Sequence, residues 1–105
     1  MAILAISVTP IGTGTPSVGD YVADAVRVIE ASGLPHRLNA MHTEVEGDLE
    51  QLLALIPRIH HACFARGAQR VSTVVKIDDR RDAPSSMEAK VGSVRAKIGP
   101  ASQDA

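Results

Sequence analysis

The sequence predicts a small α+β domain built on a four-stranded antiparallel sheet, and three observations support this prediction. Hydrophobic residues make up 45% and charged residues 22% of the 105-residue chain, which is typical of a globular domain. Stretches with alternating apolar residues, typical of strands, are interspersed with stretches of helical spacing. Glycine and proline mark the ends of these stretches. We expect a single domain over residues 1–98, with residues 99–105 as a flexible C-terminal tail.

The first half of the chain predicts a strand, a helix and two further strands. Residues 2–8 alternate with a period of two, which is typical of a strand. Ser17 and Asp20 form a capping-box pattern that predicts the start of a helix, and Gly33 is placed to end that helix in the left-handed conformation. We expect a second strand over residues 34–41 and a short third strand over residues 43–46, joined by a tight turn near Met41 and His42.

The second half predicts a helix, a strand and a short final helix. Asp48 is the expected N-cap of a helix whose leucines and isoleucines keep helical spacing, and Gly67 ends it. Residues 71–77 are β-branched and alternating, and they form the clearest strand pattern in the chain. Ser85 and Glu88 then predict the N-terminal cap of the last helix.

This order, β-α-β-β-α-β followed by a C-terminal helix, is that of a ferredoxin-like fold. Two helices of that fold cover one face of the four-stranded antiparallel sheet and leave the other face open. Because Met41 and Val74 are expected on the open face, we predict that this face or a nearby edge contacts a second copy of the chain. The predicted open-face residues are Ala5, Ser7, Thr9, Asn39, Met41, Glu44, Glu46, Ser72, Val74 and Lys76.

Charge and composition argue against several classes of function. Eleven basic and twelve acidic residues leave a net charge of −1, and aromatic residues are only 2%, so neither binding to the phosphate backbone of a nucleic acid nor base stacking is favoured. One cysteine permits no internal disulfide, and the longest apolar run, residues 2–6, is too short for a membrane helix. No dinucleotide or phosphate-loop fingerprint occurs. We expect a cytoplasmic protein with no cofactor, nucleic-acid or membrane partner.

His60 and Cys63 are three residues apart on a predicted helix, a spacing that can hold two metal ligands. A structural zinc site needs four ligands, and the sequence places no other histidine obviously within reach. Cys63 falls on the apolar side of the helix, where a free cysteine behaves as a small hydrophobic residue. We therefore predict no metal site, and no catalytic residue either, because no base is evident beside the thiol.

Three stretches of the sequence, taken together and in order, match the pattern of a known protein family. They are residues 8–22, which begin VTPIGT, residues 41–47, MHTEVEG, and residues 70–80, RVSTVVKIDDR. In this order they resemble the small thiamine-binding protein family, long known as an uncharacterised family and related to YkoF-like domains. The resemblance covers residues 3–98. It implies a ferredoxin-like subunit without assigned catalytic activity, which forms homodimers or homotetramers and binds thiamine or its hydroxymethylpyrimidine half.

Two positions depart from the pattern usual in that family. Ala5 stands where family members usually carry an acidic residue, so the open face has one carboxylate fewer. His42 stands where they usually carry a glycine, which adds an imidazole beside the expected pocket.

An aminopyrimidine needs an acceptor for its amine, a hydroxyl or amide for a ring nitrogen, and apolar walls. The thiazolium cation of thiamine would also pair with a carboxylate. We expect these groups on the predicted hairpin and the neighbouring first strand, while solvated strand residues remain the alternative explanation for the glutamates. The candidate ligand-binding residues there are Thr43, Glu46, Glu44, Asn39, Met41, Ser7 and Thr9.

The glycine- and threonine-rich loop over residues 11–16 precedes a predicted helix N-terminus, which favours anions. Thr13 and Ser17 are therefore candidates to hold a phosphate or a hydroxymethyl oxygen. The alternative is that Ser17 serves only as a helix cap.

We therefore predict a non-enzymatic, homo-oligomeric binding protein for thiamine or hydroxymethylpyrimidine. One alternative is a small dimeric ferredoxin-like enzyme, of the cofactor-free monooxygenase or isomerase type, in which His42 and Asn39 would stand in for catalytic groups. Another is a regulatory or structural oligomer that binds no ligand.

Overall fold

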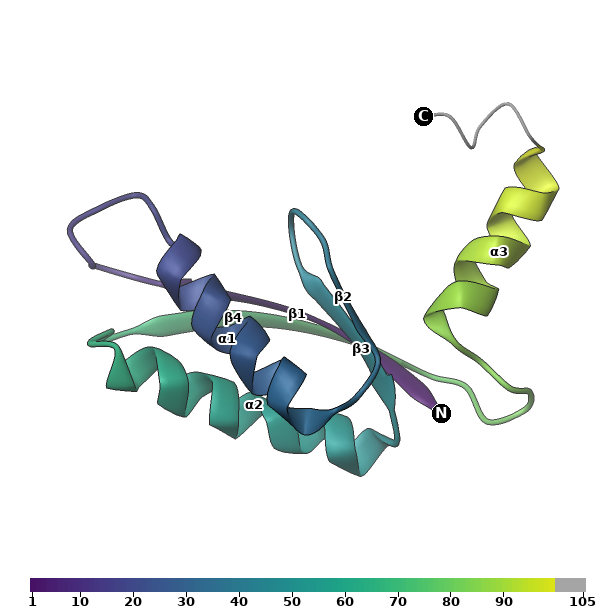
Figure 1. Cartoon of the computed structure of the whole chain (residues 1–105), viewed down its shortest axis with the longest axis horizontal. Helices are drawn as coiled ribbons and strands as arrows, with labels where there is room; N and C mark the ends of the chain where they lie inside the picture. The colour runs from purple at the N-terminus through teal and green to yellow at the C-terminus, as the bar shows by residue number, and fades with distance from the viewer. Residues whose placement is uncertain (100–105) are drawn as a thin grey trace.

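The computed structural model describes residues 1–99, and its strands and helices follow the predicted order (Figure 1). The sheet is antiparallel with the strand order β2-β3-β1-β4, which confirms the α+β ferredoxin-like fold. Residues 100–105 of the expected tail lie outside the described residues. The elements are β1 (Ala2–Pro10), α1 (Gly19–Ser32), β2 (His36–Leu38), β3 (Thr43–Gly47), α2 (Leu49–Ala65), β4 (Val71–Asp79) and α3 (Met87–Ile98).

Strand β1 lies in the middle of the sheet and has neighbours of unequal length. β4 pairs with all nine residues of β1, from Ala2 to Pro10. β3 pairs with β1 only as far as Ile6, which faces Thr43. The last part of β1 is therefore bordered by β4 alone within the described sheet.

Helices α1 and α2 lie side by side over the same face of the sheet, and the hydrophobic core fills the space between them and the strands (Figure 1). Alternate side chains of β1 point into this core, while the helices contribute residues at helical spacing. Burying each large apolar side chain stabilises the fold by about 1.5–3 kcal/mol. The largest fully buried side chains are Leu4, Ile29, Val45, Leu52, Ile59 and Cys63.

The ends of α1 agree only in part with the sequence prediction. Gly33 ends α1 with a φ of 74°, the predicted left-handed conformation. The predicted capping box at Ser17 and Asp20 is wrong, because Val18 is the N-cap and no side chain bonds to the free amides. The Ser17 amide instead donates to Oγ1 of Thr15 at 3.2 Å, so a local turn leads into the helix.

The other two helices begin with polar caps. Asp48 is the N-cap of α2, as predicted, and its amide donates to Oε1 of Gln51 at 3.2 Å. Helix α3 begins one residue later than predicted, because Ser86 and not Ser85 is the N-cap. The Ser86 hydroxyl accepts a hydrogen bond from the Ala89 amide at 3.0 Å.

The second strand is shorter than the sequence prediction. β2 ends at Leu38, because the Asn39 amide donates to the His42 carbonyl at 3.0 Å and turns the chain back. Asn39 and Met41 therefore lie in the turn between β2 and β3 and not on the open face of a strand, which corrects the prediction. Met41 is 81% exposed at this turn.

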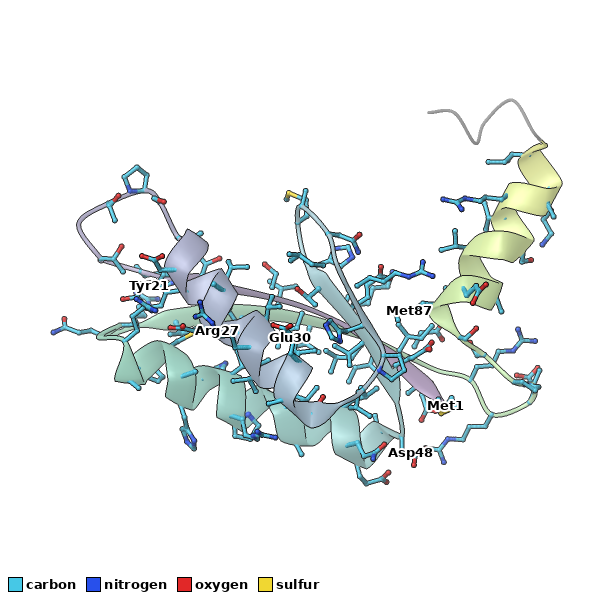
Figure 2. All side chains as sticks on the ribbon, viewed as in Figure 1. Met1, Tyr21, Arg27, Glu30, Asp48 and Met87 are labelled. Carbon is cyan, nitrogen blue, oxygen red and sulfur yellow. The ribbon has the colours of Figure 1, made fainter. Side chains whose placement is uncertain are left out.

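Helix α3 is attached to the sheet by its first turn and leads away from the other elements, with Met87 at its base (Figures 1 and 2). Met87 is buried, its amide donates to Oε2 of Glu46 at 2.8 Å, and Lys90 pairs with Asp78. No helix in residues 1–99 combines the length and apolar character needed to cross a membrane. The exposed apolar residues farther along α3 are Val91, Val94 and Ile98.

Candidate functional site

The open face of the sheet carries a pocket of about 470 Å³ beside the base of α3. Its volume lies in the range of about 300–1,000 Å³ that small-molecule sites occupy. Both charged and apolar side chains line it, and they come from the three longer strands, the β2–β3 turn and α3. The residues of this open-face pocket are Ile3, Ala5, His42, Glu44, Lys76, Ile77, Asp78 and Lys90.

The strand register places two opposite charges on either side of a small floor residue. Ala5 of β1 faces Glu44 of β3 on one side and Lys76 of β4 on the other. Since residues that face each other across antiparallel strands share a face, all three lie on the open side. Neighbouring strands are about 4.8 Å apart, so the Glu44 and Lys76 backbones are separated by about 10 Å. The Ala5 methyl group leaves the space between them unfilled.

The Glu44 carboxylate is held in place by the turn that precedes β3. Nδ2 of Asn39 donates to Oε1 of Glu44 at 2.8 Å, and Nε2 of His42 lies 3.9 Å from the same oxygen. The Glu44 side chain is 31% exposed, so the carboxylate is oriented by protein groups and still accessible from solvent. Asn39 thus positions Glu44, whichever molecule the carboxylate contacts.

A second row of the open face serves to attach α3. Ile3 faces Glu46 on one side and Asp78 on the other. Both carboxylates have a partner in the first turn of α3, because Glu46 accepts from the Met87 amide and Asp78 pairs with Lys90. Ile3 is only 7% exposed beneath this contact. Glu46, predicted as a ligand-binding residue, therefore anchors α3 and does not line the open-face pocket.

Thr43 lies on the opposite side of the sheet from both glutamates. It is 5% exposed and faces the helices, because successive strand residues point to opposite faces. It borders a smaller hollow of about 60 Å³ between the β2–β3 turn and α1, together with Ile29 and Met41. The structure thus does not bring Thr43 and Glu44 to one pocket.

The other predicted site residues do not line the open-face pocket. Ser7 and Thr9 follow Ala5 along β1, away from α3, and neither lines the open-face pocket. Thr13 and Ser17 belong to the loop at the opposite end of the sheet from α3 (Figure 1). The Thr13 hydroxyl donates a hydrogen bond to the Thr15 carbonyl at 3.1 Å, so its donor is already engaged within the loop.

Four titratable residues of the pocket are not among the predicted ligand-binding residues: His42, Lys76, Asp78 and Lys90. The strand pattern places Lys76 on the open face. When the same alternation is continued by one residue beyond residues 71–77, it places Asp78 on that face as well. His42 was noted beside the pocket only through the family resemblance. Lys90 comes from α3, whose position against the sheet no local pattern indicates.

His60 and Cys63 have separate partners and do not meet at a common site. Nε2 of His60 lies 2.7 Å from the Thr73 hydroxyl, whereas Cys63 is fully buried in the core. Burial raises the pKa of the Cys63 thiol, and the nearby negative charge of Asp24 raises it further. No cluster of three or more His, Cys, Asp or Glu side chains suited to a metal ion occurs within residues 1–99.

The sequence model of the thiamine-binding protein family matches residues 4–95. The chain belongs to this family. The thiamine-binding protein family also includes relatives known by the name UPF0045. One of them, the UPF0045 protein YqgV of Bacillus subtilis, is 44% identical over 104 residues, which cover 95% of this chain and 100% of the relative.

Two solved structures are similar to this thiamine-binding family member over almost the whole fold. Protein MJ1052 of Methanocaldococcus jannaschii has a TM-score of 0.82 at 32% identity, covering 89% of this chain and 94% of that chain. A DUF77 domain from Bacillus cereus has a TM-score of 0.79 at 31% identity, covering 91% of each chain.

Proposed function

We propose that the chain is a non-enzymatic binding protein for thiamine or its hydroxymethylpyrimidine half. Membership of the thiamine-binding protein family supports this class of ligand. The observation that carries the assignment to the open-face pocket is the Glu44 carboxylate, which Asn39 holds beside the uncovered Ala5 floor.

The chemistry of an aminopyrimidine fits this arrangement. Its exocyclic amine is a donor, and a carboxylate is an acceptor with room for several hydrogen bonds. Asn39 and His42 both approach Oε1 of Glu44, so Oε2 is the oxygen that accepts from the ligand amine. A hydrogen bond to a charged acceptor is roughly twice as strong as one between neutral groups. The flat ring lies over the Ala5 methyl group, with Ile3 as an apolar neighbour on the same face.

The residues of the open-face pocket support the two alternative functions less well than they support ligand binding. An enzyme of the ferredoxin-like type would use His42 or Asn39 as a catalytic group, but both side chains are directed to Glu44. A structural oligomer without ligand would leave unexplained why a pocket with a positioned carboxylate lies on the open face. Homo-oligomerisation remains part of the proposal and is supported by Val74, which is 68% exposed on that face. A cytoplasmic location is likewise proposed.

Isothermal titration calorimetry with thiamine and with hydroxymethylpyrimidine tests the proposal. We expect micromolar dissociation constants for at least one compound, weakened at least tenfold, about 1.4 kcal/mol, by Glu44→Gln. Glu30→Gln on the exposed side of α1 is the matched control and should bind as the unmodified chain does. Absence of heat and of thermal stabilisation at millimolar concentrations of both compounds would contradict the proposal.

A further inference from the structure

We propose that the ligand of the open-face pocket carries a phosphate, and that Lys76 binds it. This inference rests on the proposed function and specifies the ligand as a phosphomonoester of the aminopyrimidine, hydroxymethylpyrimidine phosphate. It depends on three features of the pocket: an ammonium group without a counter-ion, the spacing between that group and Glu44, and the neutralisation of the acidic residue beside it.

The first feature is the set of charges around the pocket. Glu44 is held by Asn39 and His42, and Asp78 is paired with Lys90. The Lys76 ammonium forms no ion pair or side-chain hydrogen bond with any residue of the described chain, 1–99. The residue that faces it is Ala5, which offers no charge. The pocket therefore has one positive group available to a ligand.

The second feature is the distance that a ligand has to span. The backbones of Glu44 and Lys76 are about 10 Å apart across the sheet, and both side chains project from the same face. A ligand that reaches both side chains therefore needs a donor for the Glu44 carboxylate at one end and an anionic group for the Lys76 ammonium at the other. In hydroxymethylpyrimidine phosphate the amine and the phosphorylated methylene are on adjacent ring carbons, so a single ring carries both groups on neighbouring substituents. The phosphate of a thiamine phosphate is farther away, at the end of the thiazolium side chain.

The third feature is the ion pair between α3 and the sheet. Asp78 lies two residues after Lys76 in β4, so both side chains are on the open face. Without a partner, the Asp78 carboxylate would repel a phosphate at Lys76. Lys90 pairs with Asp78 and offsets that charge, so the wall of the pocket next to Lys76 is neutral overall.

Calorimetry at low ionic strength with hydroxymethylpyrimidine, its phosphate ester and inorganic phosphate tests this inference. We expect the ester to bind at least tenfold more tightly than the free alcohol, and the difference to shrink as salt is added. Lys76→Met, which replaces the side chain with an uncharged one that is one atom shorter, should abolish the preference, whereas Lys76→Arg should retain it. Lys97→Met, on the exposed last turn of α3, is the matched control.

The possible results separate this inference from the function on which it rests. Equal affinity for alcohol and ester, both weakened by Glu44→Gln, would overturn the phosphate assignment and leave the proposed function standing. A preference that survives in Lys76→Met, or inorganic phosphate that binds as tightly as the ester, would also overturn it. Absence of binding by every compound in this test and by thiamine would overturn both.

Discussion

The Glu46 carboxylate on β3 accepts a hydrogen bond from the backbone amide of Met87, 2.8 Å away and 41 residues later in the chain. Met87 is the first residue of α3, where backbone amides lack partners within the helix and the helix dipole favours a negative charge. One carboxylate from the sheet thus fixes the start of a helix that would otherwise have little to hold it.

Replacing Glu46 with alanine should loosen α3 without unfolding the domain. The lost cap is worth about 0.5–2 kcal/mol, and α3 has few other attachments. Hydrogen exchange followed by mass spectrometry should show faster exchange at the first amides of α3, with unchanged protection in β1. Unchanged exchange in α3, combined with loss of ligand binding, would mean that Glu46 serves the ligand instead.

Replacing Ile59 with alanine should strongly destabilise the fold. Ile59 is completely buried between α2 and the sheet, and such truncations cost about 2–5 kcal/mol. Urea unfolding measures the change in the free energy of unfolding. Ile98→Ala provides the comparison because Ile98 is 58% exposed, and it should change the stability by less than about 0.5 kcal/mol. Similar losses for the two variants would contradict the assigned core.

The ion pair between Asp24 of α1 and Arg66 after α2 should make stability depend on pH in the acid range. The hydrogen bond from Arg66 holds the pKa of the Asp24 carboxyl below its usual range, and nearby positive charge adds to the effect. A lowered pKa stabilises the fold above the pKa of the unfolded chain, and this contribution disappears as the pH falls through the folded pKa. Asp24→Asn should therefore lower the melting temperature at pH 7, and the difference should narrow toward pH 3. If the difference in melting temperature between the two proteins stayed constant from pH 7 to pH 3, the ion pair would not be its source.

The Cys63 thiol should be unreactive in the folded protein. Burial raises its pKa, so at pH 8 the nucleophilic thiolate is scarce, and the closed core also excludes reagents. Titration with a disulfide reagent should give no reaction under native conditions and one thiol per chain in guanidinium. Rapid labelling of the native protein would show that the core opens near α2.

The fold could be predicted from the sequence because its signals are local. Alternation in β1 and β4, the left-handed Gly33 and the Asp48 cap each depend on residues close together in the chain. The length of β2 could not be predicted, because the bond between the Asn39 amide and the His42 carbonyl decides where that strand ends.

The site could be predicted only in part. Glu44 was among the predicted residues, and the period of two in a strand already implied that Thr43, its neighbour, points the other way. The role of Glu46 could not be read from the sequence, because it depends on a contact with α3 across 41 residues of chain. The strand pattern assigned Lys76 to the correct face. That its ammonium has no counter-ion could not be predicted, because this depends on the positions of all the neighbouring charged side chains in the folded chain.

The floor of the pocket has a consequence for how this lineage can diversify. A single methyl group at position 5 separates the two charged walls, and the core lies on the far side of the same strand. A mutation of that one codon would introduce bulk or charge at the position proposed for the ligand while leaving the packed interior untouched. Position 5 can therefore change the chemistry of the pocket at little risk to folding.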